Sequence, residues 1–308
     1  MLLCILGPTA VGKTEIAIAV AQRLNAEIVS ADSRQIYRYM DIGTAKPTPC
    51  QQAQVRHHLV DVVDPDERFS VADYQRAADN AIGDIQSRGK RAMLVGGAGL
   101  YFRAIVDGLF DGPNADPAFR GGLRAEAQKF GAEVLHRRLS RVDPESASRI
   151  HPNDLTRVIR ALEVYEKTGK VISDLQKEWI RTSPRYSFVA FGINRERQEL
   201  YQRIEARVDK MLESGLLEEI QRLIARGYDK NLPAMQGFGY KELIDYLDGK
   251  YDWDTAVNLL KRNTRRYAKR QLTWFRNDPR IKWINLSDID FNTAVQVVHS
   301  SLDTISIQ

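Results

Sequence analysis

Residue types that can bind a phosphate or diphosphate meet in one short segment near the N-terminus, Gly7-Pro8-Thr9-Ala10-Val11-Gly12-Lys13-Thr14. The glycines let the backbone approach an anion closely, Lys13 adds a mobile cation, and Thr14 supplies a hydroxyl group for magnesium. An apolar run at Met1–Leu6 precedes this segment and helical periodicity at Glu15–Leu24 follows it, which is the context that a P-loop requires. A plain Gly/Pro turn before a helix is the alternative. By itself a P-loop would suggest ATP or GTP as the ligand.

A carboxylate, Asp32, follows the second predicted strand, Ala26–Ser30. In an open parallel sheet the carboxyl ends of the strands face the ligand crevice, so we expect Asp32 to lie opposite the P-loop. There it could bind magnesium or accept a proton from a nucleophile, and Ser33 and Gln35 could hydrogen-bond a polar substrate. An Asp-Ser pair after a strand is also common in turns and caps. The segment alone leaves both interpretations open.

The third predicted strand, Arg91–Val95, runs into Gly96-Gly97-Ala98-Gly99 without an acidic residue. A nucleoside triphosphate hydrolase would be expected to hold its magnesium with an aspartate here, so the pattern weakens the ATPase interpretation. The glycines either let the backbone pack against a ligand or make a tight turn between a strand and a helix.

The elements that must position these residues alternate between strand and helix over the first hundred residues. With a helix at Val71–Ser87 and a return strand at Tyr186–Ile193, the pattern predicts an α/β fold: a P-loop core with a mostly parallel sheet flanked by helices. From Ala118 onward helical periodicity replaces it and predicts an all-helical insertion domain. We therefore expect a core domain over 1–117, the helical insertion over 118–198, and the second part of the core, with a basic helix, over 199–308.

Composition excludes several classes of protein. The chain has 308 residues, of which 43% are hydrophobic and 28% charged, which is ordinary for a globular protein. Its sequence contains no apolar run of about 20 residues and no secretory signal, so we expect a cytoplasmic protein without membrane contact. Separately, we expect a monomer. Cys4 and Cys50 are too few for a disulfide framework or a cysteine-based zinc site. The adjacent His57 and His58 point in different directions, so any metal is expected to be magnesium held by oxygens.

Positive charge is concentrated late in the chain. The net charge is +5, and the segment from Lys261 to Arg270 holds six basic residues and no acid. On a helix, one face would carry Arg262, Arg265, Arg266, Lys269 and Arg270. Such a face suits a polyanion, although a run of charge is often only solvated. Both interpretations remain open from this segment.

Eight ordered segments together resemble bacterial tRNA dimethylallyltransferases, also called tRNA isopentenyltransferases. The resemblance runs from about Leu2 to Arg276 and rests on GPTAVGKT, SADSRQIYRYMDIGTAKPT, HHLVDVVDPDERFSVADY, GGAGLYFRAI, ADPAFR, NDLTRVIRALEVY, AMQGFGYKEL and RRYAKRQLTWFR. It implies transfer of a dimethylallyl group from dimethylallyl diphosphate to the exocyclic amine of the adenosine 3′-adjacent to the anticodon, with release of diphosphate and with Mg²⁺ as cofactor. The alternatives are a P-loop small-molecule kinase and an RNA-binding module whose P-loop is structural.

The resemblance also implies roles for individual residues. The P-loop would bind the diphosphate, with Thr9 and Lys13 catalytic and Thr14 on the metal, and Asp32 would be the general base. Contacts to tRNA are implied for Asp32, Ser33, Arg34, Gln35, Ala98, Arg120, Thr156, Arg157, Val158, Ile159 and Arg160. Two of these residues depart from the family pattern: Ala98 stands where threonine is usual, and Arg34 where methionine is common. The adenine is expected to flip out of the anticodon loop to be reached.

Overall fold

The strand that precedes the P-loop lies inside a parallel sheet. In the computed structural model, which describes residues 1–110, 112–180 and 184–303, six strands pair in the order β3-β2-β4-β1-β5-β6, and every pairing is parallel. The strands are β1 (Leu2–Leu6), β2 (Ala26–Ala31), β3 (His57–His58), β4 (Arg91–Gly96), β5 (Phe188–Asn194) and β6 (Ile281–Asn285). The predicted α/β fold with a mostly parallel sheet is thereby confirmed. The two-residue edge strand β3 was not anticipated.

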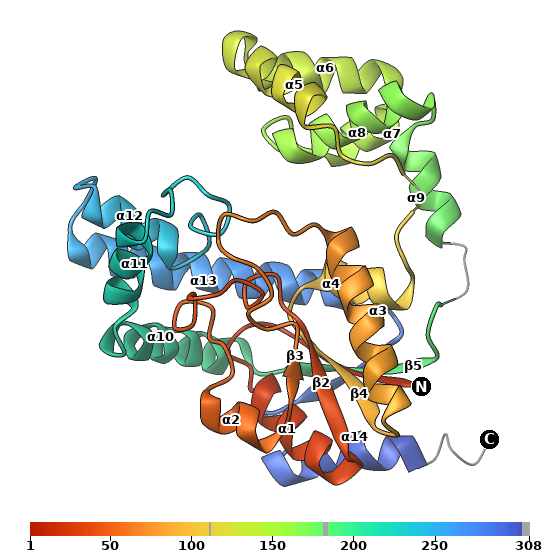
Figure 1. The fold of residues 1–308 in the computed structure, drawn as a ribbon, viewed down its shortest axis with the longest axis vertical. Coiled ribbons are helices and arrows are strands. Elements are labelled where there is room, and N and C mark those ends of the chain that lie inside the picture. Colours follow the sequence, from red (N-terminus) through yellow and green to blue (C-terminus); the bar gives the residue numbers. More distant parts are fainter. Residues whose placement is uncertain (111, 181–183, 304–308) are drawn as a thin grey trace. The chain divides into compact units, whose positions relative to one another are not determined.

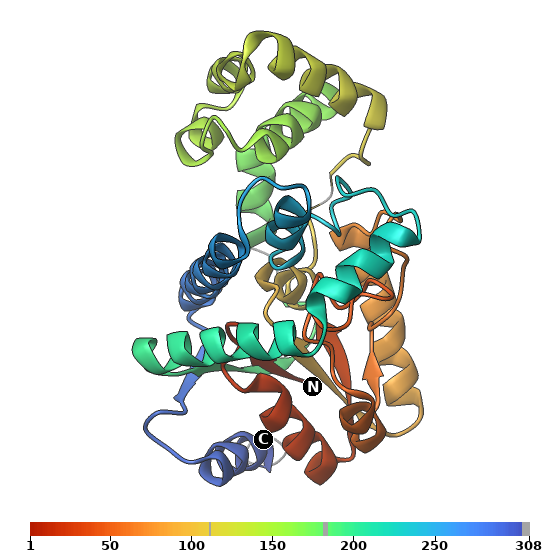
Figure 2. The ribbon, with the colours of Figure 1, turned by 90° about the vertical axis from the view of Figure 1, so that its left-hand side faces the viewer.

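Helices cover both faces of this sheet. The helices outside residues 107–185 are α1 (Lys13–Leu24), α2 (Pro49–Gln54), α3 (Val71–Ser87), α4 (Gly99–Val106), α10 (Arg197–Glu213), α11 (Leu216–Ala225), α12 (Tyr240–Leu247), α13 (Trp253–Arg276) and α14 (Phe291–Asp303). Helices α1 and α14 lie side by side on one face, as Figures 1 and 2 show, and α3 and α4 pack on the other. All five residues of β1 are buried, as expected for a central strand covered on both sides.

A third apolar cluster lies at the carboxyl end of the sheet. It joins Ile36, Met40 and their neighbours after β2 to the inward faces of α10, α11, α12 and α13. The carboxylate of Glu219 on α11 is buried in this cluster. It accepts hydrogen bonds from the backbone N–H groups of Asp41, Ile42 and Gly43, and from the hydroxyl group of Tyr240. These bonds fix the loop that follows Asp32.

The helical segment forms a compact unit of its own, Asp107–Arg185. Its helices are α5 (Pro117–Phe130), α6 (Ala132–Val142), α7 (Pro144–Arg149), α8 (Leu155–Thr168) and α9 (Ile172–Ile180). The side chain of Asp154 caps α8, and Gly169 ends it in the left-handed conformation. The helical unit was expected over 118–198, but it both begins and ends earlier. It ends earlier because β5 pairs with β1 and so belongs to the core. The core unit comprises the remaining parts, Met1–Val106 and Tyr186–Gln308.

Among the residues that the structure describes, no helix has both the length and the apolar character needed to cross a bilayer.

Candidate functional site

The P-loop connects β1 to α1 and leaves the start of that helix open to an anion. Gly12 stands at the N-cap with a φ of 105°, and no side chain caps the helix there. The unpaired N–H groups and the helix dipole therefore remain available to a negative charge. Two arginines satisfy carbonyl oxygens of the loop: Arg203 donates to Ala10 O at 3.0 Å and Arg195 to Val11 O at 3.0 Å. These bonds neutralise oxygens that would otherwise repel an anion.

Two cations converge on the P-loop. The ammonium group of Lys13 donates to Pro8 O at 2.6 Å, and the guanidinium group of Arg207, from α10, lies 3.3 Å from Thr9 Oγ1. Burial and the neighbouring Arg207 lower the pKa of Lys13 to about 8, against the opposing influence of Asp32 and Glu15. Burial also lowers the pKa of Arg207. Holding two cations together out of water is unfavourable, and an anion between them would relieve that cost.

Asp32 lies after β2 at the carboxyl end of the sheet. One of its carboxylate oxygens, Oδ1, accepts hydrogen bonds from the backbone N–H groups of Arg34 at 2.8 Å and Gln35 at 3.4 Å. Over the described chain, the other oxygen accepts no hydrogen bond from the protein. Asp32 therefore forms the turn that was one of its two predicted roles, and one oxygen also stays free for a ligand or proton.

Gln271 on α13 bridges the P-loop and the turn after β4. It is buried, its Oε1 accepts from Thr9 N at 2.9 Å, and its Nε2 donates to Gly97 O at 2.9 Å. A Cβ on Gly97 would lie 2.2 Å from Gln271 Nε2, so a larger residue here would displace this amide from its bridge. To the two predicted explanations for the glycines after β4, packing against a ligand and a tight turn, Gly97 adds a third: close packing against a side chain of the protein itself.

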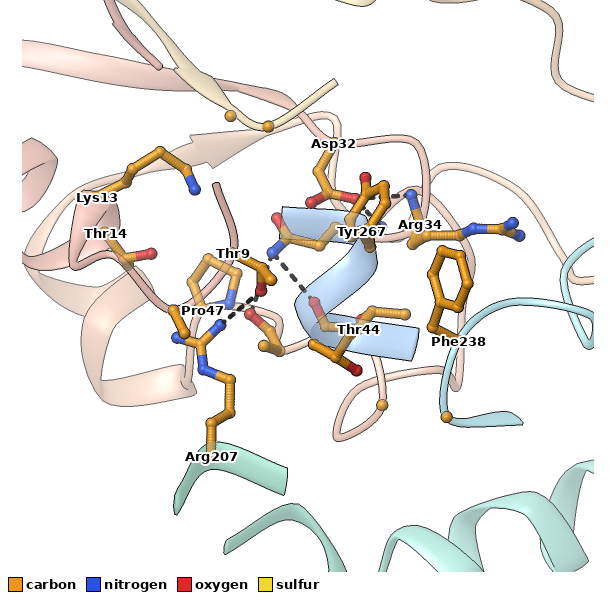
Figure 3. Close-up of a pocket in the computed structure, with 18 of the residues that line it drawn as sticks. Thr9, Lys13, Thr14, Asp32, Arg34, Thr44, Pro47, Arg207, Phe238 and Tyr267 are labelled. Carbon is orange, nitrogen blue, oxygen red and sulfur yellow. Dashed lines mark hydrogen bonds between the residues drawn. The ribbon is translucent and has the colours of Figure 1, made fainter. Parts of the chain in front are cut away.

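These groups line one cavity of about 230 Å³. In the view of Figure 3, Lys13 and Thr14 lie at the left-hand end, and Arg34 and Phe238 at the right-hand end. Asp32 and Tyr267 lie above the middle of the cavity in this view, and Arg207 reaches up from α10 below. The whole cavity belongs to the core unit. Its lining combines P-loop residues, the segment Asp32–Gln35, the loop Gly43–Pro47, and side chains of α10 and α13.

The segment Asp32–Gln35, for which tRNA contacts are implied, is largely held by the protein itself. Gln35 accepts from Ser30 Oγ at 3.1 Å and donates to Ala45 O at 3.1 Å, so both ends of its amide are engaged. Arg34 donates to Pro233 O at 2.7 Å, which ties this segment to the loop before α12. Ser33 lines the cavity with them. Ala98 donates its N–H to Ala31 O at 3.0 Å and packs beside the core cluster under α3 and α4.

The helical unit places its predicted tRNA contacts in three different environments. Thr156 and Arg157 are exposed on α8, and Arg157 makes a 3.4 Å ion pair with Asp154. Val158 and Ile159 are buried in the core of the unit, where their side chains cannot meet RNA.

Arg120 and Arg160 bind a single buried carboxylate, Glu163, at 2.6 Å and 2.5 Å. Although burial by itself would raise the pKa of Glu163, hydrogen bonds from Arg120, from the backbone of Asp116 and from Arg160 lower it to about 2. The two arginine side chains keep 30% and 27% of their surface exposed. Their main contact is therefore the ion pair with Glu163 inside the helical unit, and the remaining part of each side chain faces solvent.

The basic helix α13 divides its cations into two groups. Lys261 pairs with Asp209 at 2.6 Å, and Arg265 pairs with Glu205, both acids on α10. In the described parts of the chain, no ion pair to an acid is found for Arg262, Arg266, Lys269 or Arg270. Arg265 therefore does not belong with the face that was predicted to meet a polyanion.

Sequence reasoning missed Arg207 and Gln271, the two side chains that complete the site from α10 and α13. Each lies within a regular helix, and neither stands in a local motif that marks it as part of a site. The only signal is their place on helices that follow the return strand, since elements after a strand of the sheet can reach its carboxyl edge.

Comparisons with known proteins agree on one family. A family model described as IPP transferase matches residues 35–278. A tRNA dimethylallyltransferase of Thermotoga maritima is 53% identical over 281 residues, covering 91% of this chain and 91% of that protein. The tRNA dimethylallyltransferase 2 of Geotalea daltonii is 52% identical over 283 residues, covering 92% and 87%.

Solved structures give the same result. The full-length tRNA isopentenylpyrophosphate transferase of Bacillus halodurans has a TM-score of 0.74 at 45% identity, with 98% of this chain and 95% of that chain covered. A eukaryotic dimethylallyltransferase acting on tRNA has a TM-score of 0.83 at 29% identity, with 100% and 80% covered.

Proposed function

The chain belongs to the IPP transferase family of tRNA dimethylallyltransferases, and from this premise we propose its reaction. The protein transfers the dimethylallyl group of dimethylallyl diphosphate to the exocyclic amine of the adenosine 3′-adjacent to the anticodon of tRNA. The observation that carries this proposal is the cavity that joins a diphosphate site to a carboxylate. Lys13 and Arg207 converge on the P-loop in it, and Asp32 also lines it with one oxygen free.

The diphosphate binds at the start of α1, where the loop N–H groups and two cations stabilise the charge that grows as it leaves. In the transfer, the bond between the allylic carbon and the diphosphate oxygen breaks, and its electron pair leaves with the diphosphate. A bond forms between that carbon and the adenine nitrogen. Thr9 holds Arg207 through its hydroxyl group at 3.3 Å, which orients the guanidinium group toward the leaving group.

Magnesium fits the donor set at this end of the cavity. Thr14 offers one hydroxyl oxygen beside Lys13, and within the described residues no cluster of three His, Cys, Asp or Glu side chains could form a metal cage. Mg²⁺ usually keeps several waters and binds through one or two protein oxygens together with substrate phosphates. Thr14 would hold the ion, which neutralises charge on the diphosphate when bound.

Asp32 accepts the proton that the adenine amine loses. Two backbone N–H groups hold Oδ1, so the free oxygen has a fixed direction. An exocyclic amine is a weak nucleophile, and a positioned carboxylate is the aid it needs. Ser33 and Arg34 lie beside the base that enters the cavity, whereas Gln35 supports the loop Gly43–Pro47 from behind.

The tRNA contacts of the helical unit are proposed for its exposed side chains. Thr156 and Arg157 bind the RNA backbone, and the exposed edges of Arg120 and Arg160 contribute while Glu163 holds them. We also propose that the protein acts as a monomer in the cytoplasm, where unmodified tRNA is found. Sedimentation of the purified chain at micromolar concentration would test the first point.

The reaction itself is tested with labelled dimethylallyl diphosphate, Mg²⁺ and an unmodified anticodon stem-loop. Label should enter the RNA at the adenosine next to the anticodon, with one diphosphate released for each group transferred. A stem-loop carrying guanosine at that position is the matched control and should stay unlabelled. If no label enters RNA and the protein consumes ATP with a small-molecule acceptor instead, the proposal is wrong and the chain is a P-loop kinase.

A further inference from the structure

An exposed aromatic ring stands at the rim of the cavity. Phe238 lies between two glycines in the loop before α12, and 39% of its surface is exposed. It lines the cavity together with Arg34, and it also lines a second hollow formed by α12 and α13. Figure 3 places its ring beside Arg34, at the opposite end of the cavity from Lys13.

The ring of Phe238 is held from behind. Its centroid lies 5.1 Å from that of Tyr267 at an interplanar angle of 35°, and the guanidinium carbon of Arg270 lies 5.4 Å from the Phe238 centroid and 5.9 Å from the Tyr267 centroid. Tyr267 and Arg270 both belong to α13. Such a backed aromatic ring, with an arginine beside it, is the geometry on which an unstacked base can settle.

The second hollow is positively charged. Lys241 of α12 lines it, together with Arg262, Arg266 and Arg270 of α13. Its two acids are already engaged: Glu242 accepts from Asn263 Nδ2 at 2.7 Å and Asp245 binds Lys250 at 2.5 Å. The three arginines are four residues apart, so successive guanidinium groups start about 6 Å apart along the helix. Unpaired arginines at this spacing suit the phosphates of an extended single strand better than a peptide.

We propose that Phe238 is the stacking platform for a nucleotide that flanks the modified adenosine, with its phosphates on Arg266 and Arg270. The inference rests on the proposed function and adds a further contact to it. When the adenosine flips into the cavity, it breaks its stacking with the bases on either side. The ring at the rim offers one of those bases a new face, and this lowers the cost of flipping.

The experiment combines protein and RNA changes. Phe238→Ala and Phe238→Trp are compared with the wild type on stem-loops that carry an abasic site on the 5′ or the 3′ side of the target adenosine. Loss of one base–aromatic stack costs about tenfold in affinity, so Phe238→Ala should weaken binding of the intact stem-loop by about that factor. Phe238→Trp should bind the intact stem-loop as tightly as the wild type does. On the RNA with the relevant abasic site, the wild type and Phe238→Ala should bind equally.

Two matched controls keep the outcome specific. Phe291→Ala removes another exposed aromatic ring of the core unit, 45% exposed on α14, and should leave binding unchanged. Arg266→Gln should reduce the salt dependence of binding by about one phosphate contact, whereas Arg265→Gln combined with Glu205→Gln, a neutral change in an existing pair, should not.

The proposal is overturned if Phe238→Ala loses the same factor on intact and on both abasic RNAs, or loses nothing. Either result leaves the proposed function standing as long as the wild type still labels the intact stem-loop. If the wild type labels no RNA, the proposed function fails instead, and the two failures are thus distinguished.

Discussion

The pH dependence of diphosphate binding offers the sharpest test of the site, because it depends on one lysine. Burial and the neighbouring Arg207 lower the pKa of Lys13 from 10.5 to about 8. The free protein therefore loses this positive charge as pH rises through 8. If only the charged form binds, the fraction of competent protein falls from about nine-tenths at pH 7 to about one-tenth at pH 9, and the dissociation constant for pyrophosphate rises about tenfold.

The pH dependence of folding stability has the opposite sign to that of pyrophosphate binding. Because the pKa of Lys13 is lower in the folded chain than in the unfolded chain, the unfolded chain binds more protons between pH 8 and 10.5. The contribution of Lys13 to stability therefore increases with pH through that window. Pyrophosphate should raise the thermal midpoint most at pH 7 and least at pH 9.5, while the free protein does not lose stability in parallel.

Calorimetric titration with inorganic pyrophosphate and Mg²⁺ from pH 6.5 to 9.5 provides the assay. Two buffers of different ionisation enthalpy count the protons taken up, which should amount to about half a proton per site at pH 8. Lys13→Arg replaces the titrating lysine with a group that stays charged, so the loss of pyrophosphate affinity above pH 8 (the alkaline limb) should flatten. The same variant controls for ionisation of the ligand itself. Arg207→Gln should weaken binding at pH 7 yet move the limb to higher pH, since the cation that lowers the pKa of Lys13 is gone. An unchanged limb in Lys13→Arg would refute the reasoning.

The other predictions concern the base, the buried bridges and the RNA. Asp32→Asn can keep its turn and should lower kcat by about 10²–10⁴-fold while binding the stem-loop almost normally; lost affinity with normal kcat would contradict its role. Glu163→Gln should destabilise the helical unit by about 3 kcal/mol. Because the folded pKa of Glu163 is about 2 against 4.5, the wild type should lose this advantage as pH falls between those values, and parallel acid-unfolding curves for the two proteins would argue against it. Gln271→Ala should lower kcat/KM about tenfold through two unpaired backbone groups, and normal turnover would make its bridge dispensable. Arg157→Gln should reduce the salt slope of stem-loop binding by about one contact, whereas Arg160→Gln should mainly lower the thermal midpoint.

Local sequence signals accounted for the first half of the site. The P-loop pattern fixed its own backbone and the start of α1, because glycine spacing and helix periodicity act over a few residues. The position of Asp32 followed from the rule that parallel strands end at one edge of the sheet. The helix predicted near Val71–Ser87 is confirmed, and in the structure a capping box of Ser70 and Asp73 fixes its start.

The remaining parts depend on pairings between distant residues, which a single sequence does not display. Arg207 meets Thr9 across 198 positions, and Gln271 meets Thr9 across 262. In the helical unit, the resemblance implied an RNA contact for Arg120, but the sequence did not show that Arg120 also binds Glu163, which lies 43 residues away on another helix. A charged side chain on a predicted helix gives no sign of whether an acid will face it. Whether an acid faces such a side chain is determined by tertiary packing.

These distant pairings explain why a P-loop can serve a leaving group here. A hydrolase places an acid after a neighbouring strand to hold magnesium on a triphosphate, but in this chain glycines after β4 receive Gln271, which binds the P-loop at Thr9 N. In the proposed mechanism, the charge of Arg207 on α10 takes over part of the role that a second metal ligand would have. The carboxylate of the site stands instead after β2, held by two N–H groups with one oxygen free. In the proposed mechanism, the cations of the cavity therefore stabilise the departing diphosphate, and Asp32 is left to act on the nucleophile.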